Sequence, residues 1–192
     1  MIFATETGAI PQADPRLLSG VLFGQLGAKP EPIAFYGQLM ADFPSPLTWS
    51  AMNMADFDAL LLPGGHAPGM RQYLGSDLLQ DKLREFWALD RPVAAICHGV
   101  LPLARAGVLR GVRTTGLLKR LERAGYYLTF WRLGRYYRTY PLYVEDEVRA
   151  AGAFFERGPK GPFTVRDGRY LSARWPGDAY LFAEAFLEML RD

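Results

Sequence analysis

The chain has few of the residues that disulfides and most metal sites require. It contains one cysteine, Cys97, so no disulfide can form within it, and two histidines, His66 and His98. One thiol and two imidazoles at these spacings match no zinc-ligand pattern, so we expect no metal site and no cofactor. A single unpaired cysteine is typical of proteins from reducing compartments, which favours the cytoplasm.

Long apolar runs and a charge excess of one sign are also missing. No apolar stretch approaches the roughly 18 residues of a membrane-spanning helix, and residues 1–6 lack the basic start of a secretion signal. The 22 basic and 20 acidic side chains nearly cancel, and the net charge of +2 gives no general reason to expect nucleic acid or anionic membrane as partners. With 49% hydrophobic residues, the 192 residues can bury a large core. We expect one soluble cytoplasmic domain over 1–192.

Short apolar runs alternate with segments of helical periodicity. The runs at 57–62 and Val93–Ile96 are uniformly apolar, as in a parallel sheet covered on both faces. Between them, 76–89 has a helical apolar face and Ser76 as its N-cap. Asp167-Gly168 predicts a hairpin. Further strands are expected at 2–5, 163–166 and 169–173, and helices from Pro15 and at 33–41, 99–106, 117–131, 144–150 and 179–190. The pattern predicts an α/β fold.

The cysteine lies where an apolar strand meets a helix. In Pro92-Val-Ala-Ala-Ile-Cys97-His98-Gly99 the strand ends, and Ala95 and Gly99 on either side of the thiol are small. This pattern is typical of a nucleophile elbow, in which the nucleophile occupies a tight turn before a helix. The helix N-terminus is expected to lower the thiol pKa from about 8.5. The alternative is that Cys97 is a small buried hydrophobic residue.

A second loop, containing Gly64, Gly65 and His66, follows the strand at 57–62. If the two strands are neighbours in a parallel sheet, both loops leave its carboxyl edge, where ligands bind. The N–H groups of Gly65 and His98 could then bind an oxyanion, and His98 could act as general base for Cys97. Gly64 and His66 are candidates for substrate binding. Alternatively, the glycine pair forms only a tight turn, His66 caps the following turn, and His98 is a core histidine.

The acid that would orient the histidine is not evident. Asp178, which precedes the last predicted helix, and its neighbour Trp175 are candidates for facing the site and binding substrate. The alternative for Asp178 is an N-terminal helix cap. Glu122 and the acidic run 145–147 are expected on solvated helix faces.

Residues 105–138 contain nine basic residues and one acidic residue, interleaved with aromatic residues. Basic and aromatic side chains together are used to bind single-stranded nucleic acid. We prefer the alternative of an amphipathic helix whose polar side is basic, with an apolar stripe formed by Leu117, Leu121, Ala124, Leu128 and Trp131. A surface for a partner subunit is also possible, and nucleic acid is not an expected partner.

Two motifs together resemble those of the DJ-1/PfpI superfamily. They are Leu60-Leu-Leu-Pro-Gly-Gly-His66 and, about thirty residues later, Val93-Ala-Ala-Ile-Cys-His-Gly99. The likeness continues through Thr114-Thr-Gly116, Tyr143-Val-Glu-Asp-Glu147 and Asp167-Gly-Arg-Tyr-Leu-Ser-Ala-Arg-Trp-Pro-Gly-Asp178. The resemblance implies a class I glutamine amidotransferase-like fold, which is a flavodoxin-like three-layer α/β sandwich with a mostly parallel central sheet.

The resemblance also implies chemistry and assembly. It suggests a cysteine-dependent amide or peptide hydrolase, or a glyoxalase or deglycase, that acts on a small-molecule carbonyl or amide substrate. Cys97 would be the nucleophile, His98 its partner, and the N–H groups of Gly65 and His98 the oxyanion hole. It implies a homodimer and no cofactor. The alternative within the superfamily is a non-catalytic stress protein that senses redox changes or acts as a chaperone.

One difference from the superfamily leads to a further expectation. Such proteins begin with a strand, an acidic loop whose glutamate contacts the cysteine, and a helix, whereas residues 1–5 here resemble the second strand. The single PfpI-like domain is therefore expected to be truncated at its N-terminus. Since the first strand lies in the middle of the sheet, its loss should leave a cleft beside the strand that ends at Cys97.

Overall fold

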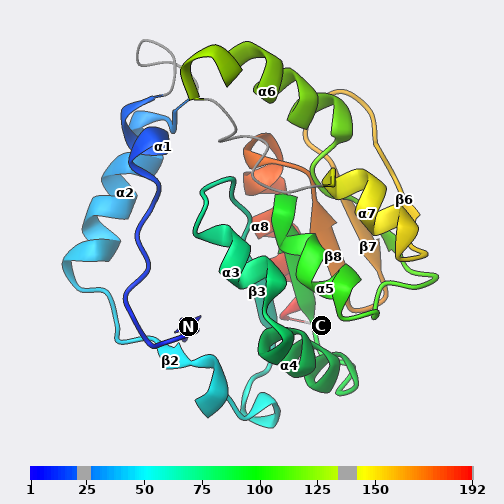
Figure 1. The fold of residues 1–192 in the computed structure, drawn as a ribbon. Helices are drawn as coiled ribbons and strands as arrows, with labels where there is room; N and C mark the ends of the chain where they lie inside the picture. The colour runs from blue at the N-terminus through cyan, green and yellow to red at the C-terminus, as the bar shows by residue number, and fades with distance from the viewer. Residues whose placement is uncertain (21–26, 134–141, 192) are drawn as a thin grey trace. The chain divides into compact units, whose positions relative to one another are not determined.

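The computed structural model describes residues 1–20, 27–133 and 142–191 (Figure 1). These residues divide into two compact units, Met1–Met52 and Asn53–Asp192. The elements of the first unit are β1 (Ala4–Thr5), α1 (Pro15–Ser19), α2 (Pro30–Ala41), β2 (Leu47–Thr48) and a 3-10 turn at Trp49–Ala51. The expectation of a single domain over 1–192 stays a prediction.

The first unit is built around one short pair of parallel strands, β1 and β2. Helix α1 begins at Pro15, as expected, because Pro has no N–H to leave unsatisfied in the first turn. The Asp14 carboxylate accepts a hydrogen bond from the N–H of Arg16 at 3.0 Å. The helix predicted at 33–41 is confirmed as α2, which begins three residues earlier, at Pro30.

The second unit has an α/β architecture. Its strands are β3 (Leu60–Leu62), β4 (Val93–Ile96), β5 (Arg113–Thr114), β6 (Phe154–Phe155), β7 (Thr164–Asp167) and β8 (Tyr170–Ala173). Its helices are α3 (Met70–Gly75), α4 (Asp77–Trp87), α5 (Leu101–Arg105), α6 (Lys119–Leu133), α7 (Val144–Ala150) and α8 (Ala179–Met189), with 3-10 turns at Met54–Asp56, Cys97–Val100 and Pro176–Asp178. The main sheet has the order β3-β4-β8-β7, and β5 pairs with β6. The expected α/β class with a mostly parallel sheet is confirmed.

Strand β4 has a hydrogen-bonded neighbour on each side. It runs parallel to β3, with Leu61 opposite Ala94, and parallel to β8, with Leu171 opposite Ala94. Both edges of β4 are therefore occupied, and the predicted cleft beside this strand is wrong. Strand β7 runs antiparallel to β8, and Asp167 pairs with Tyr170, so the predicted hairpin turn lies one residue later, at 168–169.

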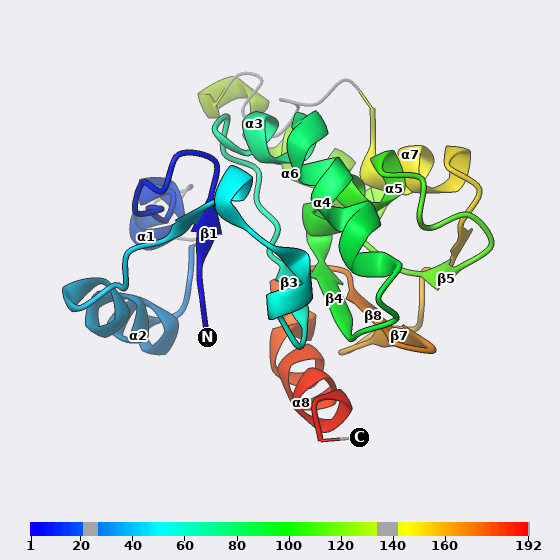
Figure 2. The same ribbon diagram turned by 90° about the horizontal axis from the view of Figure 1, so that it is seen from below.

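Helices cover both faces of the main sheet, with α8 on one side and α4 and α5 on the other (Figure 2). The predicted apolar face of α4 is confirmed, and the Ser76 hydroxyl caps this helix by accepting from the N–H of Leu79 at 3.2 Å. Helix α8 packs on the sheet through the core cluster Ala94, Leu171, Ala173, Phe182, Phe186 and Met189. These layers hold the carboxyl ends of β3 and β4 together.

Helix α6 differs from the sequence prediction in the face it buries. Leu128 and Trp131, expected in an apolar stripe, are 60% and 61% exposed, whereas Glu122 and Thr129 are buried. The face that carries Glu122 points into the protein because the Glu122 carboxylate accepts a hydrogen bond from the N–H of Val144, at 3.2 Å. The aromatic and basic residues at 134–138 lie outside the described residues. No helix in the described part of the chain has the length and apolar character needed to span a membrane.

Candidate functional site

Two loops meet at the carboxyl ends of β3 and β4. The pairing of Leu62 with Ala95 brings them side by side. A Cβ placed on Gly64 would lie 2.6 Å from the Cβ of Cys97, and one on Gly99 would lie 2.6 Å from the carbonyl oxygen of Pro63. No side chain fits at either distance, so the glycines are required for the contact between the loops. The predicted convergence of the glycine loop on the cysteine loop is confirmed.

The backbone at Cys97 has a conformation that non-glycine residues rarely adopt. Its φ is +61°, in the left-handed region, where a Cβ crowds the backbone. Such strain persists where the surroundings enforce it, and it is frequent at functional sites. The turn points the sulfur toward His98, whose Nδ1 lies 3.5 Å from Sγ. Cys97 is only 8% exposed.

The expected low pKa of the thiol is wrong. Burial raises the pKa of Cys97 to about 12, because the thiolate loses its hydration. A hydrogen bond from the backbone N–H of His98 opposes this shift, and the negative charge of Glu122 adds to it. The helix after the elbow is short, a 3-10 turn followed by the five residues of α5, so its dipole cannot offset the desolvation. The resting group is the neutral thiol.

His98 is fully buried, and its imidazole is neutral. Burial lowers its pKa well below 6.5, and the positive charge of Arg105 and the electrostatic interaction with the neighbouring His66 act in the same direction. The Arg105 guanidinium is held in place by Glu147, with 2.5 Å between Nε and Oε1, and by the carbonyl oxygen of Leu74 at 2.8 Å. A neutral imidazole beside a neutral thiol can accept the thiol proton as the sulfur attacks an electrophile.

His66 lies directly against His98. The two ring centroids are 4.4 Å apart and the rings are nearly perpendicular, at 78°. Burial lowers the pKa of His66 to about 4, so this ring is also neutral at pH 7. Gly65 is next to Met70, whose Cγ would lie 3.2 Å from an added Cβ. Within the described ranges no three His, Cys, Asp or Glu side chains are placed to hold a metal ion.

Glu122 is the acidic residue that the sequence analysis missed. It was expected on a solvated helix face, but it is only 2% exposed. Its negative charge acts on the Cys97 thiol, and its Oε2 accepts from the N–H of Val144. The sequence held a signal for an unusual role of Glu122, since residues 105–138 contain nine basic residues and Glu122 is their single acidic residue.

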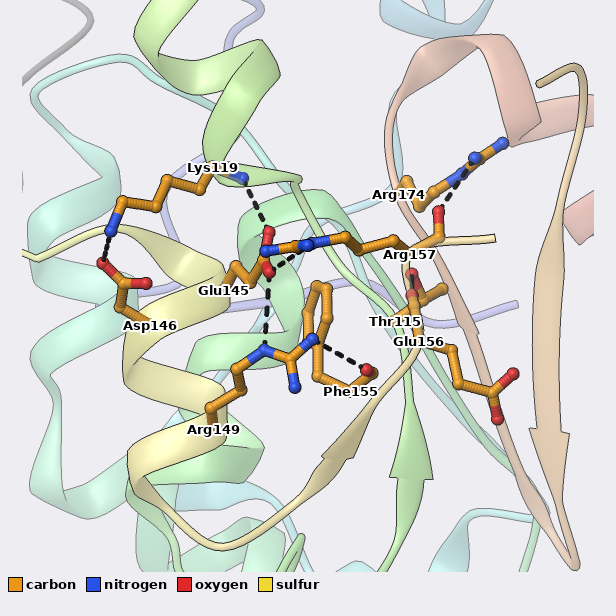
Figure 3. A network of polar contacts seen from close by, with 9 residues as sticks. All are labelled: Thr115, Lys119, Glu145, Asp146, Arg149, Phe155, Glu156, Arg157 and Arg174. Atoms are coloured by element: carbon orange, nitrogen blue, oxygen red, sulfur yellow. Dashed lines mark hydrogen bonds and ion pairs between the residues drawn. The ribbon is translucent and has the colours of Figure 1, made fainter. Parts of the chain in front are cut away.

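A buried carboxylate fixes the elements that carry Glu122 (Figure 3). Glu145, also expected in solvent, is buried because three donors surround it. It accepts from the backbone N–H of Lys119 at 3.2 Å, from Nε of Arg157 at 2.7 Å and from Nε of Arg149 at 3.4 Å. These contacts join the start of α6 to α7, whose first N–H binds Glu122. Just before α6, a Cβ on Gly116 would lie 3.4 Å from the carbonyl oxygen of Cys97.

The Asp178 carboxylate is hydrogen-bonded to residues near it in the sequence, Arg174 and Phe163. The fully buried carboxylate accepts from Nε and Nη2 of Arg174, both at 2.8 Å, and from the N–H of Phe163 at 3.0 Å. It makes no capping hydrogen bond to α8. Trp175 is partly exposed and packs over Gly177. A role of Asp178 or Trp175 toward His98 or a substrate stays a prediction.

Comparisons with known proteins agree with this fold. The family model described as ThiJ/PfpI family-like matches residues 1–162. The chain is 30% identical over 145 residues to a protein named Deglycase PfpI from Pyrococcus furiosus, covering 76% of this chain and 69% of that protein. It is 44% identical over 124 residues to Protein DJ-1 homolog D from Arabidopsis thaliana, covering 64% of this chain and 25% of that protein.

A solved structure extends the likeness to nearly the whole chain. Glyoxalase III from Candida albicans superposes with a TM-score of 0.70 at 20% identity, and the match covers 98% of this chain and 79% of that one. At this identity the likeness concerns the fold alone. The two-loop motif around Cys97 resembles that of the DJ-1/PfpI superfamily. The family match, the relatives and the shared fold point to the same group. The chain belongs to the ThiJ/PfpI family, within the DJ-1/PfpI superfamily.

Proposed function

We propose that this protein is a cysteine-dependent enzyme that attacks a carbonyl or amide carbon through Cys97. The observation that carries the proposal is the 3.5 Å contact between Sγ of Cys97 and Nδ1 of a neutral His98, at a turn whose φ is +61°. Relatives named deglycases support a carbonyl substrate over an amide.

The reaction begins from the neutral pair. As the S–C bond forms, the thiol proton moves to Nδ1 of His98, and the electron pair of the C=O bond moves to its oxygen. The N–H groups of Gly65 and His98 stabilise that oxyanion. With a 2-oxoaldehyde the oxyanion takes the proton back from His98 and gives a hemithioacetal. Loss of the proton on its C1 and protonation of C2, through an enediol, convert it into a 2-hydroxyacyl thioester, which water hydrolyses to the 2-hydroxy acid and the free thiol. With an amide the adduct expels the amine, which takes its proton from His98, and leaves a thioester for water to hydrolyse.

Glu122 and His66 tune this pair. The Glu122 carboxylate disfavours the thiolate before substrate binds, because its negative charge raises the pKa of Cys97. His66 lies against the His98 ring and limits its orientations. Both are therefore positioning residues. We also propose that His66 and Gly64 contact the substrate, and the close approach of Gly64 to the Cys97 side chain supports this.

The test is a comparison of turnover by the wild type and by Cys97→Ala, with methylglyoxal, glycated amines and small amides as substrates. We expect turnover of a carbonyl substrate that Cys97→Ala abolishes. His98→Gln should lower kcat strongly, while Asp81→Asn, on the exposed surface of α4, should leave the rate unchanged. Carbonyl turnover that survives Cys97→Ala would refute the proposal.

The alternative is a non-catalytic stress protein that senses oxidants through the same thiol. Oxidation by peroxide depends on thiolate character and exposure. A buried thiol with a pKa raised to about 12 has little of either, which favours the enzyme. Titration with peroxide separates the two functions: a sensor would form oxidised Cys97 at low dose and turn over no substrate. The expected homodimer and cytoplasmic location are likewise proposals.

A further inference from the structure

Glu145 is a buried carboxylate whose two oxygens both accept hydrogen bonds from other parts of the chain. Its side chain is 3% exposed. Oε2 accepts from the backbone N–H of Lys119, the first residue of α6, and Oε1 accepts from Nε of Arg149 and Nε of Arg157. A buried ion pair often contributes no more to stability than apolar side chains of the same volume. Packing alone therefore gives no reason for a carboxylate at this position.

The elements that Glu145 joins also contact the turn that begins at Cys97. Helix α7 packs against that turn and against α6. A Cβ on Gly116 would lie 3.3 Å from the side chain of Val144, the first residue of α7, and 3.4 Å from the carbonyl oxygen of Cys97. The N–H of Val144 donates to Oε2 of Glu122, in the first turn of α6. Glu122 is thereby held between α6 and α7, beside the elbow.

We propose that Glu145 is a positioning residue for the thiol, because it holds α6 and α7 in the arrangement that keeps Glu122 beside Cys97. This role deepens the proposed function and rests on it only in taking Cys97 as the reacting group. The negative charge of Glu122 raises the pKa of Cys97, whereas Glu145 is not among the groups that shift it. The influence of Glu145 on the thiol therefore passes through the placement of Glu122.

Arg157 reaches Glu145 from a loop that another buried group fixes (Figure 3). The buried guanidinium of Arg174 donates to the carbonyl oxygen of Arg157 at 3.2 Å and to that of Pro159 at 2.9 Å. Arg174 is itself paired with Asp178. Because the backbone of Arg157 is already ordered, less entropy is lost when its side chain binds Glu145. This support favours a defined contact over a chance ion pair at the surface.

Asp146 is a matched control for Glu145. It is the next residue of α7 and binds the same partner, Lys119, but through the side-chain Nζ, at 2.6 Å. Its own side chain is 43% exposed. Removing its charge therefore leaves the bond between Glu145 and the backbone N–H of Lys119 in place.

The substitution Glu145→Gln keeps the size of the side chain and removes one acceptor. A carboxylate accepts at both oxygens, whereas an amide has one oxygen and an NH2 group that only donates. The variant can bind the N–H of Lys119 or the two arginines, but not all three donors. In either case the link between α6 and α7 weakens. We expect Glu122 to move away from Cys97 and the pKa of the thiol to fall.

A double-mutant cycle with Glu122→Gln tests this role through the rate at which iodoacetamide alkylates Cys97 at pH 8. The thiolate fraction rises about tenfold for each unit by which the pKa falls. We expect Glu145→Gln to raise the rate several-fold in the wild-type background and to have no further effect in the Glu122→Gln background. Asp146→Asn should leave the rate unchanged in both.

Two results of the cycle would overturn the proposal. One is an unchanged rate in Glu145→Gln. The other is an equal acceleration in both backgrounds, because a general loosening of the fold would expose the thiol whether or not residue 122 is charged. Alkylation needs no turnover, so the cycle decides the role of Glu145 even if activity survives Cys97→Ala and the proposed function fails.

A second variant keeps the test available if Glu145→Gln does not fold. Arg157→Gln removes one of the donors to Oε1 of Glu145 from a side chain that is 66% exposed, so the fold should tolerate it. We expect a smaller acceleration of alkylation that is again lost in the Glu122→Gln background. A rate equal to that of the wild type, or an acceleration that persists in that background, would contradict the proposal.

Discussion

The ionisation of Cys97 is the most quantitative consequence of the structure. Its pKa of about 12, against 9.0 for an unperturbed thiol, corresponds to a thousandfold smaller thiolate fraction at pH 7 and to about 4 kcal/mol of differential stabilisation. The cause is burial, with the charge of Glu122 adding to it. The rate of alkylation by iodoacetamide should therefore rise about tenfold per pH unit from pH 7 to 10 without levelling off.

The same reaction in denaturant is the internal reference. There the rate should level off above a pH of about 9, as for an ordinary cysteine. Following the pH dependence, rather than the rate itself, separates ionisation from access to the buried sulfur. The ultraviolet absorbance of the thiolate gives a second measurement of the same pKa.

Two variants assign the cause of the shift. Glu122→Gln removes the negative charge that acts on the thiol and should lower the pKa of Cys97. Asp81→Asn removes a carboxylate on the exposed surface of α4, which is not among the groups that shift this pKa, and should leave it unchanged. An inflection at or below pH 9 in the folded wild type, or equal effects of the two variants, would refute the reasoning.

Three further predictions concern the neighbouring residues. Gly99→Ala should abolish activity and cost on the order of 1–3 kcal/mol in urea unfolding, because its Cβ would press on the carbonyl of Pro63. The pKa of His66 is about 4 in the folded protein, against 6.5 for an ordinary histidine, so the unfolded chain binds the proton first as the pH falls. Stability should thus fall by about 3 kcal/mol from pH 6.5 to 4, and His66→Gln should reduce that loss. Asp178→Asn should lower the free energy of unfolding in urea by about 3–5 kcal/mol, because it leaves the charge of Arg174 buried without its partner. A smaller loss would contradict a structural role of Asp178.

Local pattern was enough to predict the elements that build the site. The apolar run at Val93–Ile96 is strand β4 with the same bounds, and the glycine loop converges on Cys97 because β3 and β4 are adjacent. Gly99 gave a reliable signal, since a crowded turn permits no side chain. Residue types and their spacing carried these predictions, and both are visible in one sequence.

Features that depend on three-dimensional packing were predicted less well. Nothing local shows that Glu145 is surrounded by three donors, two of them arginine side chains, or that Glu122 faces the N–H of Val144. The thiol pKa was misjudged because burial at the elbow outweighs the dipole of a short helix. Whether a cleft lies beside β4 depends on which distant strand pairs with it. That strand, β8, lies more than seventy residues later in the sequence.

Mass spectrometry of the protein during turnover tests the central claim most directly. After acid quenching, we expect the peptide that contains Cys97 to carry the mass of one substrate-derived group, and we expect no such adduct in Cys97→Ala, which should also lack activity. Turnover of the same substrate with no mass added at Cys97 and an undiminished rate in Cys97→Ala would contradict the account.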